Sequence, residues 1–234
     1  MLCLSKKDIE AIGDAVLMDY AMRFPRRYGN PIDIDFFAEK HLGLDVKYQK
    51  LSDNGEVLGL TTYDSVVVDL VVDGKAMEIS VSSDTILLDN SLCSSENKYR
   101  RRFTIAHECA HQIIADMQEA QTGYSFRREF KVGSKYTYSQ FKTAEEWSEW
   151  QANYLGASLL MPKFAVLPHI RKGHQVHMFT SYDGSFNNGD YARIKRLADK
   201  LCVSVKAMEI RLKDMGFMKY GSAKEFYSEP EVSF

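Results

Sequence analysis

The sequence lacks the features that identify several large classes of protein. Its four cysteines lie far apart and form no C-x-x-C pair, which argues against a disulfide framework and against a thiolate zinc site. No apolar run approaches the roughly 20 residues of a membrane span. The first residues place their lysines after a very short apolar stretch, unlike a signal peptide. We therefore expect a cytoplasmic protein with reduced thiols and no membrane partner.

An excess of charge of one sign is also missing. The formal net charge is -2, which gives no indication of a generalised nucleic-acid-binding surface. Hydrophobic residues make up 45% of the chain and charged residues 26%, an ordinary balance for a globular protein with a sizeable core. The length of 234 residues fits one large domain or a compact core with a small appendage. We find neither an internal repeat nor a low-complexity linker.

Helical and strand-like patterns occupy different parts of the chain. Between residues 44 and 92, short β-branched runs separated by turns such as Asp73-Gly74 predict a small, mostly antiparallel sheet. No regular element is predicted for Met117–Lys142, a long surface segment, or for the Gly-, Asn- and His-rich stretch after Pro162. Apolar residues at helical spacing predict helices elsewhere. These helices cover residues 6–24, 34–41, 97–116, 143–160, 191–201 and 206–215.

One predicted helix carries a metal-binding pattern, the H-E-x-x-H motif His107-Glu108-Cys109-Ala110-His111. Residues i and i+4 of a helix lie about 40° apart around its axis and about 6 Å apart along it, so both imidazoles leave one face. Both can then bind one zinc ion, with Glu108 placed to act as general base toward the catalytic water. A shuffled chain of this composition contains the motif roughly one time in a hundred. The alternative is an amphipathic helix whose histidines pack beside the core.

Catalytic zinc normally has three protein ligands, so a third is needed. The extended motif H-E-x-x-H-x-x-G-x-x-H would put Gly at position 114 and His at position 117, where this sequence has Ile114 and Met117. That form of the motif is therefore excluded. The next acidic cluster on a predicted helix comprises Glu145, Glu146 and Glu149.

Among these three carboxylates, Glu149 is the predicted third ligand. Helical spacing from Glu149 gives a small or apolar stripe that includes Asn153 and Gly156, which is typical of a close helix–helix contact. A carboxylate in such a contact needs a charged partner, and zinc is one. Glu145 and Glu146 fit a solvated helix start. Asn153 is predicted to accept a hydrogen bond from the free N–H of a ligating histidine.

Two stretches around these residues resemble the ImmA/IrrE family of metallopeptidases. They are Arg101–His111 (RRFTIAHECAH) and Glu149–Pro162 (EWQANYLGASLLMP), of which the second is the more specific. The resemblance covers Ile32 to Pro162 and, more loosely, Leu197 to Leu212. One departure is Cys109, where the family usually has a smaller or aliphatic residue. A buried cysteine behaves as a small hydrophobe, so the resemblance holds.

The resemblance implies one zinc ion per chain bound by His107, His111 and Glu149, with Glu108 catalytic. It also implies a protein substrate, which in characterised members is a helix-turn-helix transcriptional repressor cut in response to stress or to a signal from a mobile element. The segment Met117–Lys142 varies within the family and is a candidate for substrate choice.

Several other features have both a structural and a functional interpretation. Leu197–Leu212 has the cadence of a helix-turn-helix, but the charges in its second helix are mixed, so we expect a packed helical pair or a repressor-docking surface and no direct nucleic-acid partner. His174 and His177 are expected at the surface, with stabilisation of an oxyanion as the alternative. The run Arg100–Arg102 is expected on a solvated face, with the binding of an acidic segment as the alternative. Tyr154 is expected in aromatic packing, with donation to substrate as its alternative.

The fold predicted from these patterns is α+β. A small, mostly antiparallel sheet packs against the H-E-x-x-H helix and a second ligand-bearing helix, in a zincin-like domain over residues 1–165 that begins with N-terminal helices. Residues 166–234 form a helical, helix-turn-helix-like subdomain and tail. The predicted function is that of a zinc-dependent endopeptidase. One alternative is a metal-stabilised module that sequesters a transcription regulator uncut, for which Glu108 would be unnecessary. The other is a hydrolase of a non-protein amide.

Overall fold

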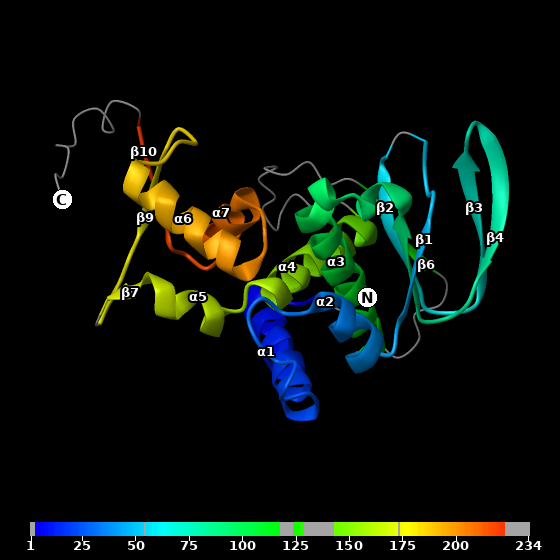
Figure 1. The fold of residues 1–234 in the computed structure, drawn as a ribbon, viewed down its shortest axis with the longest axis horizontal. Coiled ribbons are helices and arrows are strands. Elements are labelled where there is room, and N and C mark those ends of the chain that lie inside the picture. The colour runs from blue at the N-terminus through cyan, green and yellow to red at the C-terminus, as the bar shows by residue number, and fades with distance from the viewer. Residues whose placement is uncertain (1–2, 54, 118–123, 129–142, 173, 223–234) are drawn as a thin grey trace. The chain divides into compact units, whose positions relative to one another are not determined.

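The computed structural model describes residues 3–53, 55–117, 124–128, 143–172 and 174–222 (Figure 1). The fold is mixed α+β with small sheets, which confirms the predicted class. The chain divides into two compact units, Met1–Leu160 and Met161–Phe234; the division after residue 165 stays a prediction. No helix among the described residues is long and apolar enough to cross a membrane.

The first unit begins with helical elements. Helix α1 spans Lys6–Arg23 and starts with a capping box, in which Ser5 and Asp8 each bind the other's backbone N–H. A short α2 (Ile34–Phe36) continues into a π-helical turn, η1 (Phe37–His41). The fully buried ring of Tyr20 on α1 packs edge-on against Phe37, which ties α1 to this turn.

A four-stranded sheet follows, in the order β1-β5-β2-β6. Its strands are β1 (Asp45–Gln49), β2 (Val57–Thr62), β5 (Thr85–Asp89) and β6 (Tyr124–Arg128). Strand β2 pairs antiparallel with β5 and β6, whereas β1 pairs parallel with β5. A separate antiparallel hairpin joins β3 (Val66–Val72) to β4 (Lys75–Val81), and its inner side chains share an apolar cluster with Leu60 and Leu87 of the sheet.

Strand β6 corrects one prediction, because no regular element was expected between Met117 and Lys142. The strand forms by pairing with β2, more than 60 residues earlier in the chain, and so leaves no local periodicity to detect. Residues 118–123 and 129–142, on which the proposal about substrate choice falls, lie outside the described residues.

Two long helices form the centre of the first unit. Helix α3 (Lys98–Asp116) follows two 3₁₀ turns, η2 (Asn90–Cys93) and η3 (Ser95–Asn97), and α4 spans Ala144–Leu160. The two helices lie side by side (Figure 1). Strand β2 packs on one side of α3, where Gln112 Nε2 donates to Thr61 Oγ1 at 2.7 Å and to the carbonyl of Thr62 at 2.9 Å. Helix α4 in turn contacts α1 as well as α3.

The second unit contains more regular structure than the sequence predicts. Helices α6 (Asn188–Leu201) and α7 (Val205–Asp214) were expected, but α5 (Lys163–Ile170) was not. Pro162 ends the preceding helical pattern and at the same time serves as the N-cap of α5. Four short strands were also missed. They are β7 (Arg171–Lys172), β8 (Gln175–Val176), β9 (Phe179–Tyr182) and β10 (Met218–Gly221).

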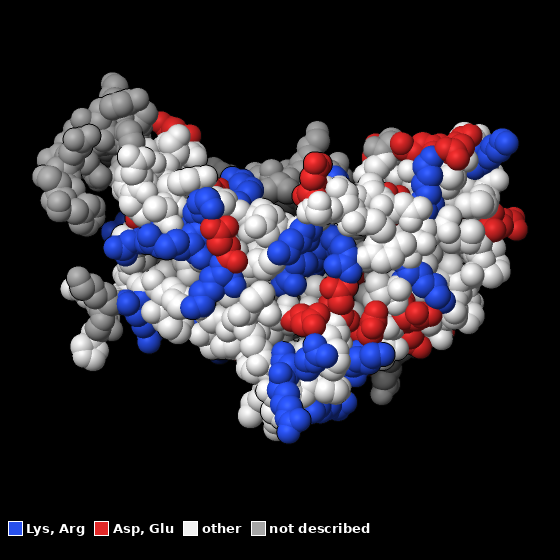
Figure 2. Space-filling view, viewed as in Figure 1, with Lys and Arg blue, Asp and Glu red and all other residues white. Residues whose placement is uncertain are grey.

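Charges of both signs lie close together on the second unit. Lys195 pairs with Asp199 on α6, and Lys206 pairs with Glu209 on α7. Basic and acidic side chains are likewise interspersed on the face shown in Figure 2. The pairing is typical of solvated helix faces, and the absence of a direct nucleic-acid partner stays a prediction.

Candidate metal centre

Helix α3 places three functional candidates at the centre of the first unit. His107 and Glu108 have no exposed surface and His111 is 3% exposed. The two imidazoles leave the same face of α3, with ring centroids 4.6 Å apart and Nε2 atoms 3.0 Å apart. Polar side chains this deeply buried need partners, and the partner comes from α4.

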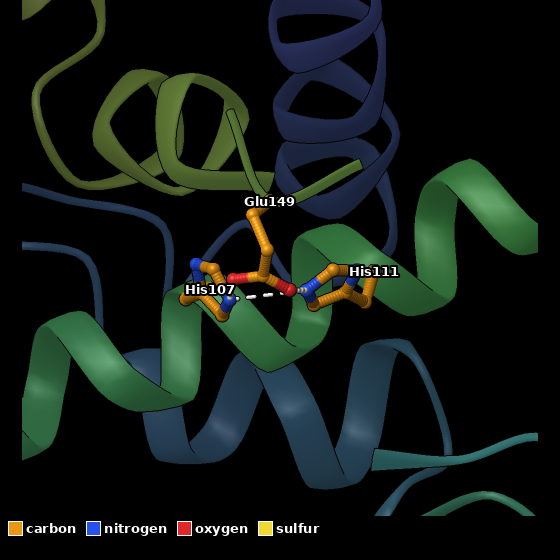
Figure 3. Close-up of side chains that lie close together, drawn as sticks. All are labelled: His107, His111 and Glu149. Carbon is orange, nitrogen blue, oxygen red and sulfur yellow. Dashed lines mark hydrogen bonds and ion pairs between the residues drawn. The ribbon is translucent and has the colours of Figure 1, made fainter. Parts of the chain in front are cut away.

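The carboxylate of Glu149 on α4 lies between the two imidazoles (Figure 3). Its Oε2 is 3.3 Å from His107 Nε2, and its Oε1 is 3.0 Å from His111 Nε2. Glu149 is 8% exposed, whereas Glu145 and Glu146 are exposed at the first turn of α4. The structure thus brings together the three side chains predicted as ligands and leaves the two other carboxylates in solvent.

The separations between these side chains suit a single metal ion. Ligand atoms about 2.1 Å from a tetrahedral ion lie about 3.4 Å from one another. The two Nε2 atoms are 3.0 Å apart, and each lies 3.0 to 3.3 Å from one oxygen of the Glu149 carboxylate, Oε2 for His107 and Oε1 for His111. Two imidazole nitrogens and one carboxylate are also the donor set of many catalytic zinc sites. Among the described residues, one group of histidine, cysteine or acidic side chains could hold a metal ion, and it consists of His107, His111 and Glu149.

Asn153, one turn after Glu149 on α4, orients one of the imidazoles. Its Oδ1 lies 3.1 Å from His107 Nδ1. An amide oxygen can only accept, so Nδ1 carries a proton. Nε2 of His107 is then the nitrogen that would bind a metal ion. This is the contact expected for Asn153 from helical spacing.

The electrostatics of Glu149 favour its ionised form. Burial by itself raises the pKa of this carboxyl group, but the hydrogen bonds and charges of His107 and His111 outweigh burial and hold the pKa well below its usual range. Glu149 is therefore an anion at neutral pH, which is the form that binds a metal ion.

Strand β2 approaches Glu108 closely at Gly59. A Cβ atom added at Gly59 would lie 2.5 Å from Glu108 Oε1 and 2.7 Å from Thr104 Cγ2. Only glycine therefore leaves room for the carboxylate between α3 and the strand. The sequence does not reveal this contact, because one glycine in a strand pattern indicates close approach without showing what approaches it.

Tyr63, directly after β2, is a second residue whose role the sequence does not reveal. Burial raises the pKa of its phenol, and the carboxylates of Glu108 and Glu149 raise it further. The phenol is thus protonated at neutral pH and can donate a hydrogen bond. This interaction with Glu108 and Glu149 depends on the tertiary packing of β2 on α3, and no motif in the sequence marks Tyr63.

Two other side chains considered in the sequence, Tyr154 and His177, form hydrogen bonds with residues other than the three proposed ligands. Tyr154 donates to Glu10 and not toward the metal centre. His177 binds Asp190 within the second unit, at 2.6 Å, while His174 is exposed. Cys109 is fully buried, and burial raises the pKa of its thiol, so it acts as a core residue.

The expectation of a solvated face for Arg100–Arg102 is wrong for Arg102, which is buried, while Arg101 is partly exposed. Arg101 forms an ion pair with Asp35 and a hydrogen bond with Tyr48. The buried Arg102 donates to the carbonyl of Ile32 at 2.9 Å. Both contacts are non-local and fasten the start of α3 to the preceding elements.

Gly156 sets the distance between the two ligand-bearing helices. A Cβ atom there would lie 3.1 Å from the carbonyl carbon and oxygen of Ala106 and from the backbone nitrogen of His107. These are backbone atoms of a helix and yield little. We expect Gly156→Ala to lower the free energy of unfolding by about 1–3 kcal/mol, as overpacking does, and to weaken metal binding because α4 moves away from α3.

Urea unfolding and chelator competition measure the two effects of Gly156→Ala. Gly29→Ala is the control, because a Cβ atom there meets no other atom within 4 Å. Unchanged stability and unchanged metal affinity in Gly156→Ala would contradict the close contact of the helices.

Comparison with family models gives one match. Residues 90–213, more than half of the chain, match the Peptidase_M78 model, described as an IrrE N-terminal-like domain. The matched region contains α3 and α4 and extends into the second unit. A search of curated proteins found no significant match.

Proposed function

Because the chain belongs to the Peptidase_M78 (IrrE N-terminal-like) family of metallopeptidases, we propose that it is a zinc-dependent endopeptidase. His107, His111 and Glu149 hold the ion, and Glu108 is the general base. The observation that carries this proposal is the convergence of two imidazole nitrogens and one carboxylate in a buried group, directly beside a second buried carboxylate on α3.

The metal ion, when bound, acts as a Lewis acid toward the scissile carbonyl and lowers the pKa of a water molecule in the site. The side chains of the chain do the rest. Glu108 accepts the proton of the attacking water at its carboxylate and returns it to the leaving amine. Asn153 keeps the proton of His107 on Nδ1, and the anionic Glu149 completes the set of ligands.

The substrate that we propose is a helix-turn-helix transcriptional repressor. This part of the proposal rests on the resemblance to the ImmA/IrrE family, whose characterised members cut such repressors. A buried general base supports cleavage over simple sequestration, since a protein that only binds a regulator has no use for a carboxylate beside its metal ion.

The first test is metal content, measured by mass spectrometry on protein purified without added metal. We expect about one zinc ion per wild-type chain and markedly less in Glu149→Ala, which removes one of three ligands. Glu145→Ala is the matched control on the same helix, because Glu145 is exposed, and it should retain the wild-type content. Wild-type protein that takes up no metal even when zinc is offered would overturn the proposed function.

The second test is cleavage. Zinc-loaded protein is incubated with purified helix-turn-helix repressors encoded in the same genome, and intact-mass spectrometry detects fragments. Fragments that require both zinc and Glu149 support the proposal. Stable, zinc-dependent complexes without fragments would favour the sequestering module instead.

A further inference from the structure

A buried carboxylate lies in the interface between α1 and α4, away from the face of α4 that carries Glu149. Glu10 on α1 is 5% exposed. Its Oε1 accepts a hydrogen bond from the hydroxyl of Tyr154 at 2.9 Å, and its Oε2 accepts one from the hydroxyl of Ser158 at 3.2 Å. Burying a carboxylate costs free energy unless the carboxylate is paired and hydrogen-bonded. The proposed catalytic steps do not use Glu10.

The partners of α1 lie on the opposite side of α4 from the metal centre. At about 100° per residue, Tyr154, Ser158 and Gln151 lie about 140°, 180° and 200° around the axis from Glu149. Gln151 belongs to the same contact, because its Oε1 accepts the backbone N–H of Leu4 at 2.8 Å. Helix α4 is thus held by α3 on the face with Glu149 and by α1 on the face behind it.

The contact with Glu10 constrains both the rotation and the axial position of α4. Tyr154 and Ser158 are four residues apart and lie on successive turns, and each binds a different oxygen of the same carboxylate. A Cβ atom at Gly13 would lie only 3.0 Å from Ser158 Oγ. The backbone of α1 is therefore close enough to α4 to leave the carboxylate little freedom.

A small rotation of α4 would be enough to break the metal centre. A side-chain tip lies about 6 Å from a helix axis, so a rotation of 20° moves it by about 2 Å. Working metal sites tolerate deviations of about 0.2 Å in their ligand distances. Binding of a metal ion by Glu149 therefore requires the rotation of α4 about its axis to be tightly fixed.

We infer that Glu10 is a positioning residue for the metal centre, which acts through Tyr154 and Ser158 to hold Glu149 at the distance at which it binds the ion. This inference rests on the proposed metal site. It assigns the α1–α4 interface a role in metal affinity in addition to its role in stability.

The test compares zinc affinity by chelator competition in wild-type protein, Glu10→Ala and Glu10→Gln. We expect at least about a tenfold loss of affinity in Glu10→Ala, as for other residues that support metal ligands indirectly. Glu10→Gln should recover most of the affinity, because an amide can still exchange hydrogen bonds with both hydroxyls. The visible spectrum of the cobalt-substituted protein should change in Glu10→Ala, since it reports the ligand geometry directly.

Tyr20→Leu is the control for a purely structural effect. It damages the aromatic packing at the other end of α1 and should lower stability while leaving zinc affinity unchanged. If Glu10→Ala does not fold, the Tyr154→Phe/Ser158→Ala double variant removes both donors and leaves the carboxylate in place. Wild-type affinity in Glu10→Ala, or in the double variant if Glu10→Ala does not fold, would overturn the inference but not the proposed function. Failure of the wild-type protein to bind zinc would overturn both.

Discussion

The Glu108→Gln protein is expected to bind its metal ion fully and to cleave its substrate about 10³-fold more slowly than the wild type. Glutamine keeps the size of the side chain but cannot accept a proton, and general-base catalysis contributes about 10²–10⁴-fold to such reactions. Metal content should not fall, because Glu108 is not among the three converging ligands. Stability should not fall either, since a neutral amide replaces a carboxylate that has no exposed surface.

The measurement is kcat on the repressor substrate, together with metal content and the urea midpoint of the same preparations. Glu146→Gln makes the same chemical change at an exposed position of α4 and should leave all three values unchanged. A Glu108→Gln protein that cleaves as fast as the wild type would show that another group is the base. If both proteins bind a repressor tightly and neither cuts it, sequestration becomes the better account.

The Gly59→Ala protein is expected to keep its metal ion and to lose about 10²-fold in kcat. The new methyl group would occupy space 2.5 Å from Glu108 Oε1 and 2.7 Å from Thr104 Cγ2, so the carboxylate or the strand must shift. Displacement of a catalytic group by about 1 Å can reduce a rate by about 10²-fold. The three ligands approach from α3 and α4 and do not require this space, so zinc affinity should change little.

A double-mutant cycle tests whether Gly59 acts through Glu108. Adding Gly59→Ala to Glu108→Gln should reduce kcat little further, because the base that the methyl group displaces is already gone. Gly29→Ala, where a Cβ atom meets open space, is the control for the substitution itself. Fully additive losses would mean that Gly59→Ala acts by a route that does not involve the base.

These two predictions differ in what the sequence contributes to each. Glu108 follows from the H-E-x-x-H spacing, because the geometry of one helix is enough to place Glu108 beside two histidines on a common face. The role of Gly59 follows from β2 crossing α3 at that residue. No pattern within β2 identifies Glu108, which lies 49 residues later, as its neighbour.

The choice of Glu149 shows how far local patterns reach. The small residues at helical spacing after Glu149 indicate a tight helix–helix contact, and the structure places Glu149 and Asn153 against α3 as that pattern predicts. The pattern does not identify α1 as the element behind α4. Glu10 and its contacts with Tyr154 and Ser158 span more than 140 residues and were not anticipated.

Local sequence patterns are thus enough to predict the mixed α+β class, most of the helices and the residues that the structure brings together as candidate ligands. Each of these depends on a period repeated within a single segment, which hydrophobic burial and helix geometry impose locally. Local patterns do not predict the parallel pairing of β1 with β5, the strand β6, the space at Gly59 or the contact of Glu10 with α4. These features arise from packing between segments far apart in the chain, and that packing depends on the shape of both partners at once.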